Sequence, residues 1–484
     1  MIKSKAKPEA LKLFMDGSIA LAKVEANGIR VDVPYLERAI RKLGKRVIKL
    51  EEELKKDKVW GLWQKEYGSE ANVGSGQQLA HVIYDILEHP CSKFTLKGKP
   101  STRKADLDTI DLPFIKQRAK LVSLERALNN NLRGLLRETV DGYLHPGFNL
   151  HTVSTYRSSS GSEKEVAQSS RSINFQNIPI RDPVIGKIIR RCFIPRDGCV
   201  LVEVDFGAME WQIASCFWRD AGMVEYASDP KKDIHRDMAA EEFLCDISQV
   251  SKKMRYIGKN GFVFPTLYGS YYVQCSRNIW NELNGVLMED GETLVLDWLK
   301  KKGIKELGRC DSKQRPVPGT FEYHGKEVED NFFHRFPVLK DGREKWIRTY
   351  REKAGFPLMT GFWVEGLYSN NQLLNIPIQG PAFHCLLWSI IQFQKWIEEN
   401  RKRSLIVGQI HDCVLADVPL DELQDVLTAL EQIMTVKIRE EWKWVIVPLK
   451  AEVDVVPEKS SWHSKEPWAC YDGVWKAKPK KLKK

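Results

Sequence analysis

A charged residue inside an apolar β pattern constrains the fold of this chain more than any other feature. The stretch SLIVGQIHDCVLADVPL (residues 404–420) has β-favouring residues at strand spacing on both sides of His411 and Asp412. Residues 408–413 are the only place for a turn, so we expect two short antiparallel strands with Asp412 near the bend. Asp412 then either caps its own turn or binds a metal ion, and the second interpretation requires another carboxylate.

A second carboxylate ends another predicted strand. Residues 199–204 (CVLVEV) are typical of a buried strand, Asp205 follows directly, and GAMEWQIASCFW then takes up helical spacing. A strand that passes into a helix places the carboxylate at one rim of a sheet, although many such aspartates only cap the helix. If one sheet contains both Asp205 and Asp412, they can bind two Mg²⁺ ions about 4 Å apart.

The segment between the two aspartates contains a candidate phosphate site. In RYIGKNGFVFPTLYGS (255–270), Arg255 and Lys259 are four residues apart on one helical face, and Phe264 and Tyr268 continue it. Two cations followed by a flat ring suit a nucleoside triphosphate, with the charges on its phosphates and the ring against its base. An ordinary helix that runs from the surface into the core has the same pattern.

Composition and charge restrict the class of protein. The 484 residues include 43% hydrophobic residues and 15 Trp, enough for a large core. The net charge of +11 falls to +5 without the six lysines of the last nine residues, KAKPKKLKK, which form either a flexible tail that attracts polyanions or a solvated end. We expect no membrane partner, because no apolar run approaches about 18 residues. The ten scattered Cys favour reduced thiols and a cytoplasmic location.

Five further motifs accompany the three described above. They are, in chain order, VEANGIRVD, STYRSSS, INFQNIPIRD, DIHRDMAAEEF and LNIPIQGPA. Together, and in the same order, the eight motifs resemble those of the polymerase portion of family A (DNA polymerase I-like) DNA polymerases. STYRSSS, for example, is similar to the family's Thr-Gly-Arg-Leu-Ser-Ser stretch. The resemblance covers about residues 18–462.

Three departures from the family pattern affect the expected site. Cys413 stands where the family usually has Glu after His-Asp, so the two aspartates must suffice as carboxylate ligands. One extra residue and Pro265 separate Lys259 from Tyr268, which predicts a one-residue helical bulge and favours Phe264 over Phe262 as the base-stacking ring. Asn371 stands where relatives often carry Arg, which puts DNA contacts at that position in doubt.

The resemblance implies a mixed α and β, right-hand polymerase fold, with an antiparallel sheet in the palm and helical fingers and thumb. We expect an N-terminal lead-in at 1–30, the thumb at 31–136 and the first part of the palm at 137–216. The fingers then follow at 217–368, the second part of the palm at 369–470, and a basic tail at 471–484.

The resemblance also implies template-directed DNA synthesis on a primer 3′-hydroxyl, with two Mg²⁺ ions as cofactors and deoxynucleoside triphosphates as substrates. Asp205 and Asp412 are the expected catalytic residues and, with Phe206, the metal ligands. Glu210 would exclude ribonucleotides. The expected nucleotide-binding residues are Glu210, His235, Arg255, Lys259, Phe264, Tyr268 and Arg181. The expected primer–template contacts are Arg157, Gln176, Asn177, Asn375, Gln379 and His411, mostly in the minor groove, whose acceptors all base pairs share.

No exonuclease motif precedes residue 18, so we expect either a polymerase without proofreading or one half of a split enzyme that works with a separate exonuclease or replication factor. The host, the physiological role and any use of RNA templates stay open. The alternative from another class is a non-catalytic, polymerase-like DNA-binding subunit. Loss of either aspartate would mark such a subunit, and both are present.

Overall fold

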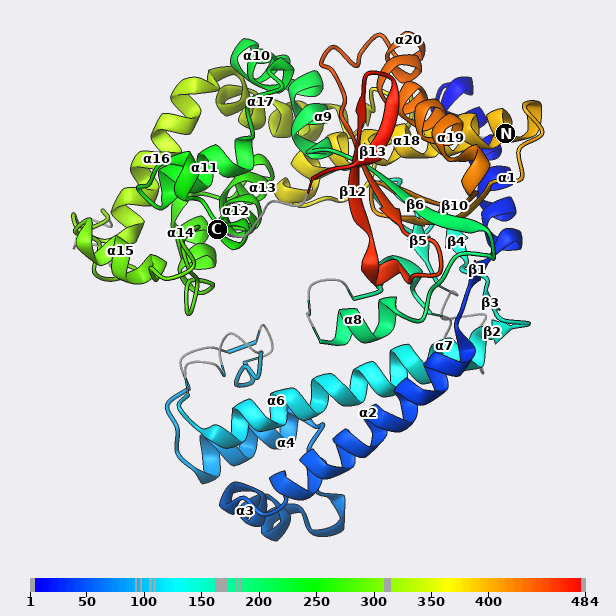
Figure 1. Ribbon diagram of the computed structural model, residues 1–484. Coiled ribbons are helices and arrows are strands. Elements are labelled where there is room, and N and C mark those ends of the chain that lie inside the picture. Colours follow the sequence, from blue (N-terminus) through cyan, green and yellow to red (C-terminus); the bar gives the residue numbers. More distant parts are fainter. Residues whose placement is uncertain are drawn as a thin grey trace.

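Three groups of elements make up the protein in the computed structural model (Figure 1). A central sheet with covering helices lies between a cluster of short helices on the left of the view and an elongated helical projection below. The structure describes residues 5–91, 94–95, 98–103, 107, 110–161, 173–179, 182, 184–308 and 315–479. Among these residues, no helix combines the length and the apolar character that crossing a bilayer requires.

The central sheet has six strands in the order β13-β12-β11-β6-β10-β9, and every neighbouring pair is antiparallel. The strands are β6 (Cys199–Phe206), β9 (Leu405–Ile410), β10 (Cys413–Pro419), β11 (Ala451–Val456), β12 (Glu466–Tyr471) and β13 (Val474–Ala477). Both predicted strand regions, 199–204 and the 404–420 hairpin, are therefore confirmed. They lie side by side in one sheet, which the interpretation of Asp205 and Asp412 as a pair requires.

Helices from distant parts of the sequence cover this sheet. The longest, α18, is largely buried and contacts both α9 and β10, while α1 packs against α18 and β9. Contact with α1 covers one edge strand of the sheet. Residues 8–27, part of the expected lead-in, are thus part of the central body. The covering helices are α1 (Pro8–Asn27), α9 (Met209–Trp218), α18 (Asn370–Glu399), α19 (Leu423–Glu431), the π-helical η8 (Gln432–Lys437) and α20 (Ile438–Glu441).

The cluster of short helices spans residues 221–353. Its members are α10 (Ala221–Ser228), α11 (Ile234–Glu242), α12 (Lys252–Gly258), the π-helical η6 (Lys259–Val263), α13 (Phe264–Leu267), α14 (Tyr272–Trp280), α15 (Val295–Lys301), α16 (Phe321–Arg335) and α17 (Pro337–Lys353). Helix α16 begins at Phe321, directly after its cap residue Thr320. The Thr320 hydroxyl caps it by accepting a hydrogen bond from the Tyr323 amide over 3.3 Å.

The projection is built on two long helical segments. Leu36, Leu43, Val47 and Leu54 form the buried stripe of α2, which packs along α6 and η3. Its elements are α2 (Val33–Leu54), α3 (Lys58–Tyr67), α4 (Gly76–Ala80), η2 (His81–Ile86), α6 (Pro113–Arg126), η3 (Ala127–Leu132) and α7 (Arg133–Glu138). The small sheet β1 (Ile29–Arg30), β3 (Tyr143–Leu144) and β2 (Thr139–Val140) lies at its base.

Short elements connect these groups. Two-stranded pairs form between β4 (Phe148–Asn149) and β5 (Ser159–Ser160), and between β7 (Phe356–Pro357) and β8 (Trp363–Val364). Helix α8 (Ile185–Arg190) precedes β6. The remaining short helices are η1 (Gly68–Glu70), η4 (Phe175–Asn177), η5 (Ile247–Gln249), η7 (Leu420–Glu422) and η9 (Trp462–Ser464).

The C-terminal region differs from the expected flexible tail. Residues 474–477 form the edge strand β13 because Trp475, 4% exposed, packs beside α19. The Gln424 side chain accepts a hydrogen bond from the Trp475 amide over 2.8 Å and donates one to its carbonyl oxygen over 3.0 Å. Residues 480–484, with four of the six terminal lysines, lie outside the described residues.

Candidate active site

The two predicted aspartates meet at one end of the central sheet. In the antiparallel register, Cys413 lies opposite Asp205, and the Phe206 amide donates to the Asp412 carbonyl oxygen over 3.3 Å. His411 and Asp412 form the turn between β9 and β10, where His411 adopts a φ of +51°. Asp412 is therefore a turn residue, but its turn lies beside the strand end that carries Asp205.

These carboxylates share an electrostatically unfavourable site. Burial, followed by the nearby Asp412 carboxylate, raises the pKa of Asp205 to about 8. Burial also raises the pKa of Asp412, while Arg157 and Lys259 oppose that shift. The Arg157 Nη2 atom lies 3.8 Å from Asp412 Oδ1. Two close carboxylates with few charges to balance them suit divalent cations, and oxygen atoms are the ligands that Mg²⁺ prefers.

Protein groups alone would not complete a metal coordination shell here. Among the described residues, no cluster of three or more His, Cys, Asp or Glu side chains has the geometry to hold a metal ion. Mg²⁺ is commonly bound through one or two carboxylates plus substrate phosphates and water. The donor set of Asp205, Asp412 and the Phe206 carbonyl fits that pattern.

A positively charged face lies beside the carboxylates. Lys259 is close enough to lower the pKa of both Asp205 and Asp412, and its Nζ atom lies 4.9 Å from the centre of the Phe264 ring. Arg255 pairs with Asp233, whose Oδ2 lies 2.7 Å from its Nε and whose Oδ1 lies 3.3 Å from its Nη2. The same Asp233 side chain caps the start of α11.

His235 lies against this charged face without compensating hydrogen bonds. Its side chain is 1% exposed, and within the described part of the chain neither ring nitrogen has a hydrogen-bond partner. Burial, followed by Lys259 and Arg255, lowers the pKa of His235 to about 3, so the imidazole is neutral at neutral pH. Its ring contacts Phe264 edge-on, with centroids 5.4 Å apart. His235 is thus a buried, neutral imidazole that the described protein groups leave without hydrogen bonds.

The predicted helical bulge is confirmed. Residues 259–263 form the π-helical turn η6, directly before Phe264 and Pro265. Phe262 is fully buried and packs edge-on against Phe332 at 5.4 Å, whereas Phe264 is partly exposed beside Lys259. The structure thus places Phe264, and not Phe262, on the charged face.

Glu210 and Tyr268 approach each other from different elements. Glu210 lies in the first turn of α9, where burial, followed by Asp412, raises its pKa. Burial, followed by the Glu210 carboxylate, raises the pKa of Tyr268, while Gln379 opposes that shift. The Tyr268 hydroxyl is buried, with the Gln379 side chain beside it. These two side chains border the aspartate pair on the side of η6.

The expected primer–template residues lie in four places, the loop of Arg157, η4, α18 and the β9–β10 turn. Gln176 Nε2 donates to Ser158 Oγ over 2.8 Å and to Gln409 Oε1 over 2.6 Å, while Asn177 is exposed. Asn375 and Gln379 are half-buried, one turn apart on α18. His411 is exposed at the hairpin turn. Arg181 lies outside the described residues.

Sequence reasoning missed several supporting residues. Glu203 shares a face of β6 with Asp205 and accepts hydrogen bonds from Trp462 Nε1 over 2.7 Å and Lys465 Nζ over 2.6 Å. Strand alternation identifies Glu203, two residues before Asp205, as a same-face neighbour. No sequence signal connects Lys465 to it. The placement of Arg157 beside Asp412 is likewise a tertiary contact across 255 residues.

Comparisons with known proteins agree with this arrangement. The family model described as "DNA polymerase family A" matches residues 34–284. The chain is 26% identical over 389 residues to a DNA polymerase of Bacillus phage SP01, covering 76% of this chain and 37% of that protein. It is 28% identical over 447 residues to the thermostable DNA polymerase I of Thermus thermophilus, covering 90% of this chain and 46% of that protein. The chain therefore spans less than half the length of these relatives.

A solved structure has the same fold. It is described as the POL domain of Pol1 from M. smegmatis in complex with DNA primer-template and dNTP. The TM-score is 0.71 and the sequence identity is 23%, with 93% of this chain and 70% of that chain covered. This likeness confirms the predicted fold class, with its antiparallel sheet and helical groups.

Proposed function

This chain belongs to DNA polymerase family A, and from that premise we propose that it adds deoxynucleotides to the 3′-hydroxyl of a DNA primer under the direction of a template. One observation carries the proposal: Asp205 and Asp412 meet at one end of β6 and β10, with Lys259 beside them. Two half-buried carboxylates that repel each other are unfavourable until cations bind between them, which supports a site where cations arrive with the substrate.

Asp205, Asp412 and the Phe206 carbonyl oxygen would hold two Mg²⁺ ions. When bound, these ions would lower the pKa of the primer 3′-hydroxyl and stabilise the charge of the leaving pyrophosphate. Lys259 and Arg157 partly balance the two carboxylates in the absence of substrate. Both cationic side chains would become available to phosphate groups once metal ions neutralise the two carboxylates.

The triphosphate would lie along the charged face. Lys259 would contact it directly, and Arg255 would exchange its partner Asp233 for phosphate oxygens, which form bidentate hydrogen bonds with guanidinium. His235 is neutral and can donate one N–H without adding charge. Arg181 is a further proposed phosphate contact. Phe264 would stack against the base, while Glu210 and Tyr268 would enclose the sugar and leave no room for a 2′-hydroxyl.

Primer and template would lie across the sheet end and α18. Arg157, Gln176, Asn177, Asn375, Gln379 and His411 are the proposed contacts. Amide and imidazole groups suit the minor groove, where they test base-pair shape without reading sequence. In this proposal the helical projection (31–136) is the thumb and residues 217–368 are the fingers, while 137–216 and 369–470 form the palm. The described cysteines are free thiols, which supports a proposed cytoplasmic location.

We also propose that these 484 residues do not proofread, because the polymerase resemblance occupies nearly all of them. One experiment tests both proposals. The purified protein, Mg²⁺ and deoxynucleotides are mixed with an end-labelled primer on a DNA template, either paired or mismatched at its 3′ end. We expect extension of the paired primer and slow extension of the mismatched one without prior shortening. Absence of extension refutes the polymerase proposal, whereas Mg²⁺-dependent shortening refutes only the second.

A further inference from the structure

Tyr156 occupies a backbone conformation that favours glycine. Its φ is +57°, in the left-handed region that bulky L residues seldom adopt. In STYRSSS it stands where the similar stretch of the family, Thr-Gly-Arg, has glycine. A tyrosine in this conformation requires surrounding contacts that hold it there.

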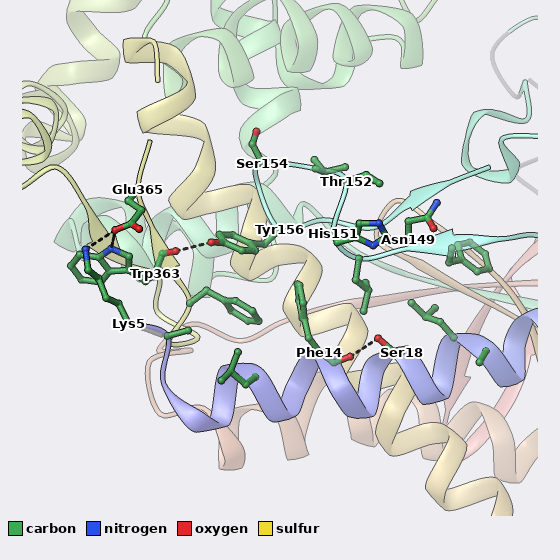
Figure 2. Close-up of a pocket in the computed structure, with 18 of the residues that line it drawn as sticks. Lys5, Phe14, Ser18, Asn149, His151, Thr152, Ser154, Tyr156, Trp363 and Glu365 are labelled. Atoms are coloured by element: carbon green, nitrogen blue, oxygen red, sulfur yellow. Dashed lines mark hydrogen bonds and ion pairs between the residues drawn. The ribbon is translucent and has the colours of Figure 1, made fainter. Parts of the chain in front are cut away.

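Three separate elements supply those contacts, as Figure 2 shows in part. The Tyr156 hydroxyl donates to the Trp363 carbonyl oxygen over 2.6 Å. Its ring centre lies 5.1 Å from that of Phe362 and 6.2 Å from that of Phe14 on α1. The ring thus forms part of the wall of a cavity of about 1030 Å³ between α1, residues 148–156 and residues 362–368.

The backbone of Tyr156 is fixed from a third direction. His384 on α18 is fully buried, and burial lowers its pKa to about 3, so the ring is neutral. A carbonyl oxygen can only accept, so His384 Nε2 donates to the Tyr156 oxygen over 3.1 Å. His384 Nδ1 then accepts from the Thr360 hydroxyl over 2.6 Å. This buried chain of hydrogen bonds holds the Tyr156 peptide against the core.

Arg157 follows directly and lies between two anchored residues. On its other side, Ser158 Oγ donates to Gln409 Oε1 over 2.9 Å, and Gln176 Nε2 donates to both of these groups. The Arg157 guanidinium extends from this fixed backbone to Asp412, where Nη2 lies 3.8 Å from Oδ1. At that length the ion pair is too long for a hydrogen bond, so the pair itself fixes the guanidinium only loosely, and the anchored backbone limits where the side chain can begin.

We propose that Tyr156 is a positioning residue that holds the Arg157 guanidinium close to Asp412. It does so by fastening the backbone just before Arg157 to α1, to α18 and to residues 356–368, here called the 356–368 segment. Its importance for synthesis rests on the proposed polymerase function, but the placement of Arg157 is a property of the fold. The N-terminal helix α1 is then a support of the active site, through Phe14.

Chemical reactivity of Arg157 tests the placement directly. The full-length protein is treated with phenylglyoxal, which modifies accessible guanidinium groups, and the modification of Arg157 is followed by mass spectrometry. Tyr156→Gly suits the left-handed backbone but removes the ring and hydroxyl, and it should speed the modification about fivefold or more. Tyr156→Phe keeps the ring and should speed it about twofold.

Tyr350→Phe is the matched control. The buried Tyr350 hydroxyl also donates to a backbone oxygen of the 356–368 segment, that of Gly366, over 2.7 Å, but among the described residues its ring contacts are with Phe356 and Tyr368 and not with the Arg157 loop. The rate of Arg157 modification should stay at the wild-type value in this variant. Equal rates in Tyr156→Gly and the wild type, or an equal increase in Tyr350→Phe, would overturn the inference.

A double-mutant cycle tests the consequence for synthesis. In single-turnover nucleotide incorporation, Tyr156→Gly should reduce the rate about tenfold when Arg157 is present and less than about twofold in an Arg157→Ala background. Equal reductions in both backgrounds would mean that Tyr156 acts without Arg157, against the inference. If the wild-type protein extends no primer, the polymerase proposal fails, while the modification rate of Arg157 still decides the placement.

Discussion

Replacing Glu210 by Ala should open the site to ribonucleotides. Glu210 and Tyr268 lie close together beside Asp412, and the Tyr268 hydroxyl is buried. If the sugar of an incoming deoxynucleotide packs against these two side chains, a hydrogen atom on its 2′ carbon faces them. No room is then left for the 2′ oxygen of a ribonucleotide. The Ala variant removes the carboxylate and one methylene, which leaves space for a hydroxyl group.

The size of the effect follows from packing and desolvation. Forcing one extra heavy atom into a filled site costs about 1–3 kcal/mol. Burying its hydroxyl without a hydrogen-bond partner costs about 1–3 kcal/mol more. At about 1.4 kcal/mol per tenfold change in rate, the sum of about 2–6 kcal/mol corresponds to a discrimination of about 30- to 10⁴-fold. The Glu210→Ala variant should lose most of this discrimination against ribonucleotides.

The assay is single-nucleotide insertion with matched deoxyribo- and ribonucleotides opposite the same template base. The ratio of the two kcat/KM values should rise about 30- to 10⁴-fold for ribonucleotides in Glu210→Ala, while deoxynucleotide use falls less than about tenfold. Glu210→Gln keeps the volume and removes the charge, so it should discriminate nearly as well as the wild type. Equal slowing of both sugars in the Ala variant, with no change in their ratio, would refute the steric argument.

Three further predictions concern Cys413, Asp205 and Gln424. Cys413→Ser should extend primers within about threefold of the wild-type rate, because the buried thiol holds no metal in this account. A loss of activity as large as that of an Asp412 variant would contradict this assignment. The pKa of Asp205 is about 8 in the folded state and about 3.9 in an unfolded chain, so the folded state binds the proton more tightly. The stability of the metal-free protein should therefore fall as the pH rises from about 4 to 8. Asp205→Asn should therefore melt above the wild type in EDTA at pH 8.5 but not at pH 4, and a constant difference in melting temperature at both pH values would count against the assignment. Gln424→Ala should lower the free energy of unfolding in urea by about 1–3 kcal/mol, because it leaves the backbone groups of Trp475 unpaired; an unchanged value would mean that β13 is held by other contacts.

The local features of the site could be predicted from sequence because they depend on short-range patterns. The β9–β10 hairpin follows from alternation on either side of a single possible turn, and β6 from an apolar run that ends in Asp205. The π-helical turn at 259–263 is predicted from the family resemblance, because this chain has one residue more than the family pattern between Lys259 and Tyr268. The two strand predictions need only a few neighbouring residues, and the structure confirms both of them as well as the turn.

Features set by distant contacts could not be predicted. The lysines near the C-terminus predict a solvated tail, but the burial of Trp475 beside α19 makes residues 474–477 a strand. Composition carries no information about that partner helix, which lies about 45 residues earlier. Arg157 looked like a DNA contact only, and its ion pair with Asp412 depends on how a loop before β6 folds back onto the sheet. The strained backbone of Tyr156 is likewise visible only once its three anchors are in place.

The central claim is that Asp205 and Asp412 together hold the metal ions of a polymerase active site. The most direct test measures single-turnover primer extension and primer–template binding in parallel for Asp205→Asn and Asp412→Asn. Extension should fall by about 10³-fold or more, because each variant removes a carboxylate ligand. Binding should stay within about threefold, since affinity comes mainly from dispersed phosphate contacts. Extension within about tenfold of the wild-type rate in either variant would contradict the claim.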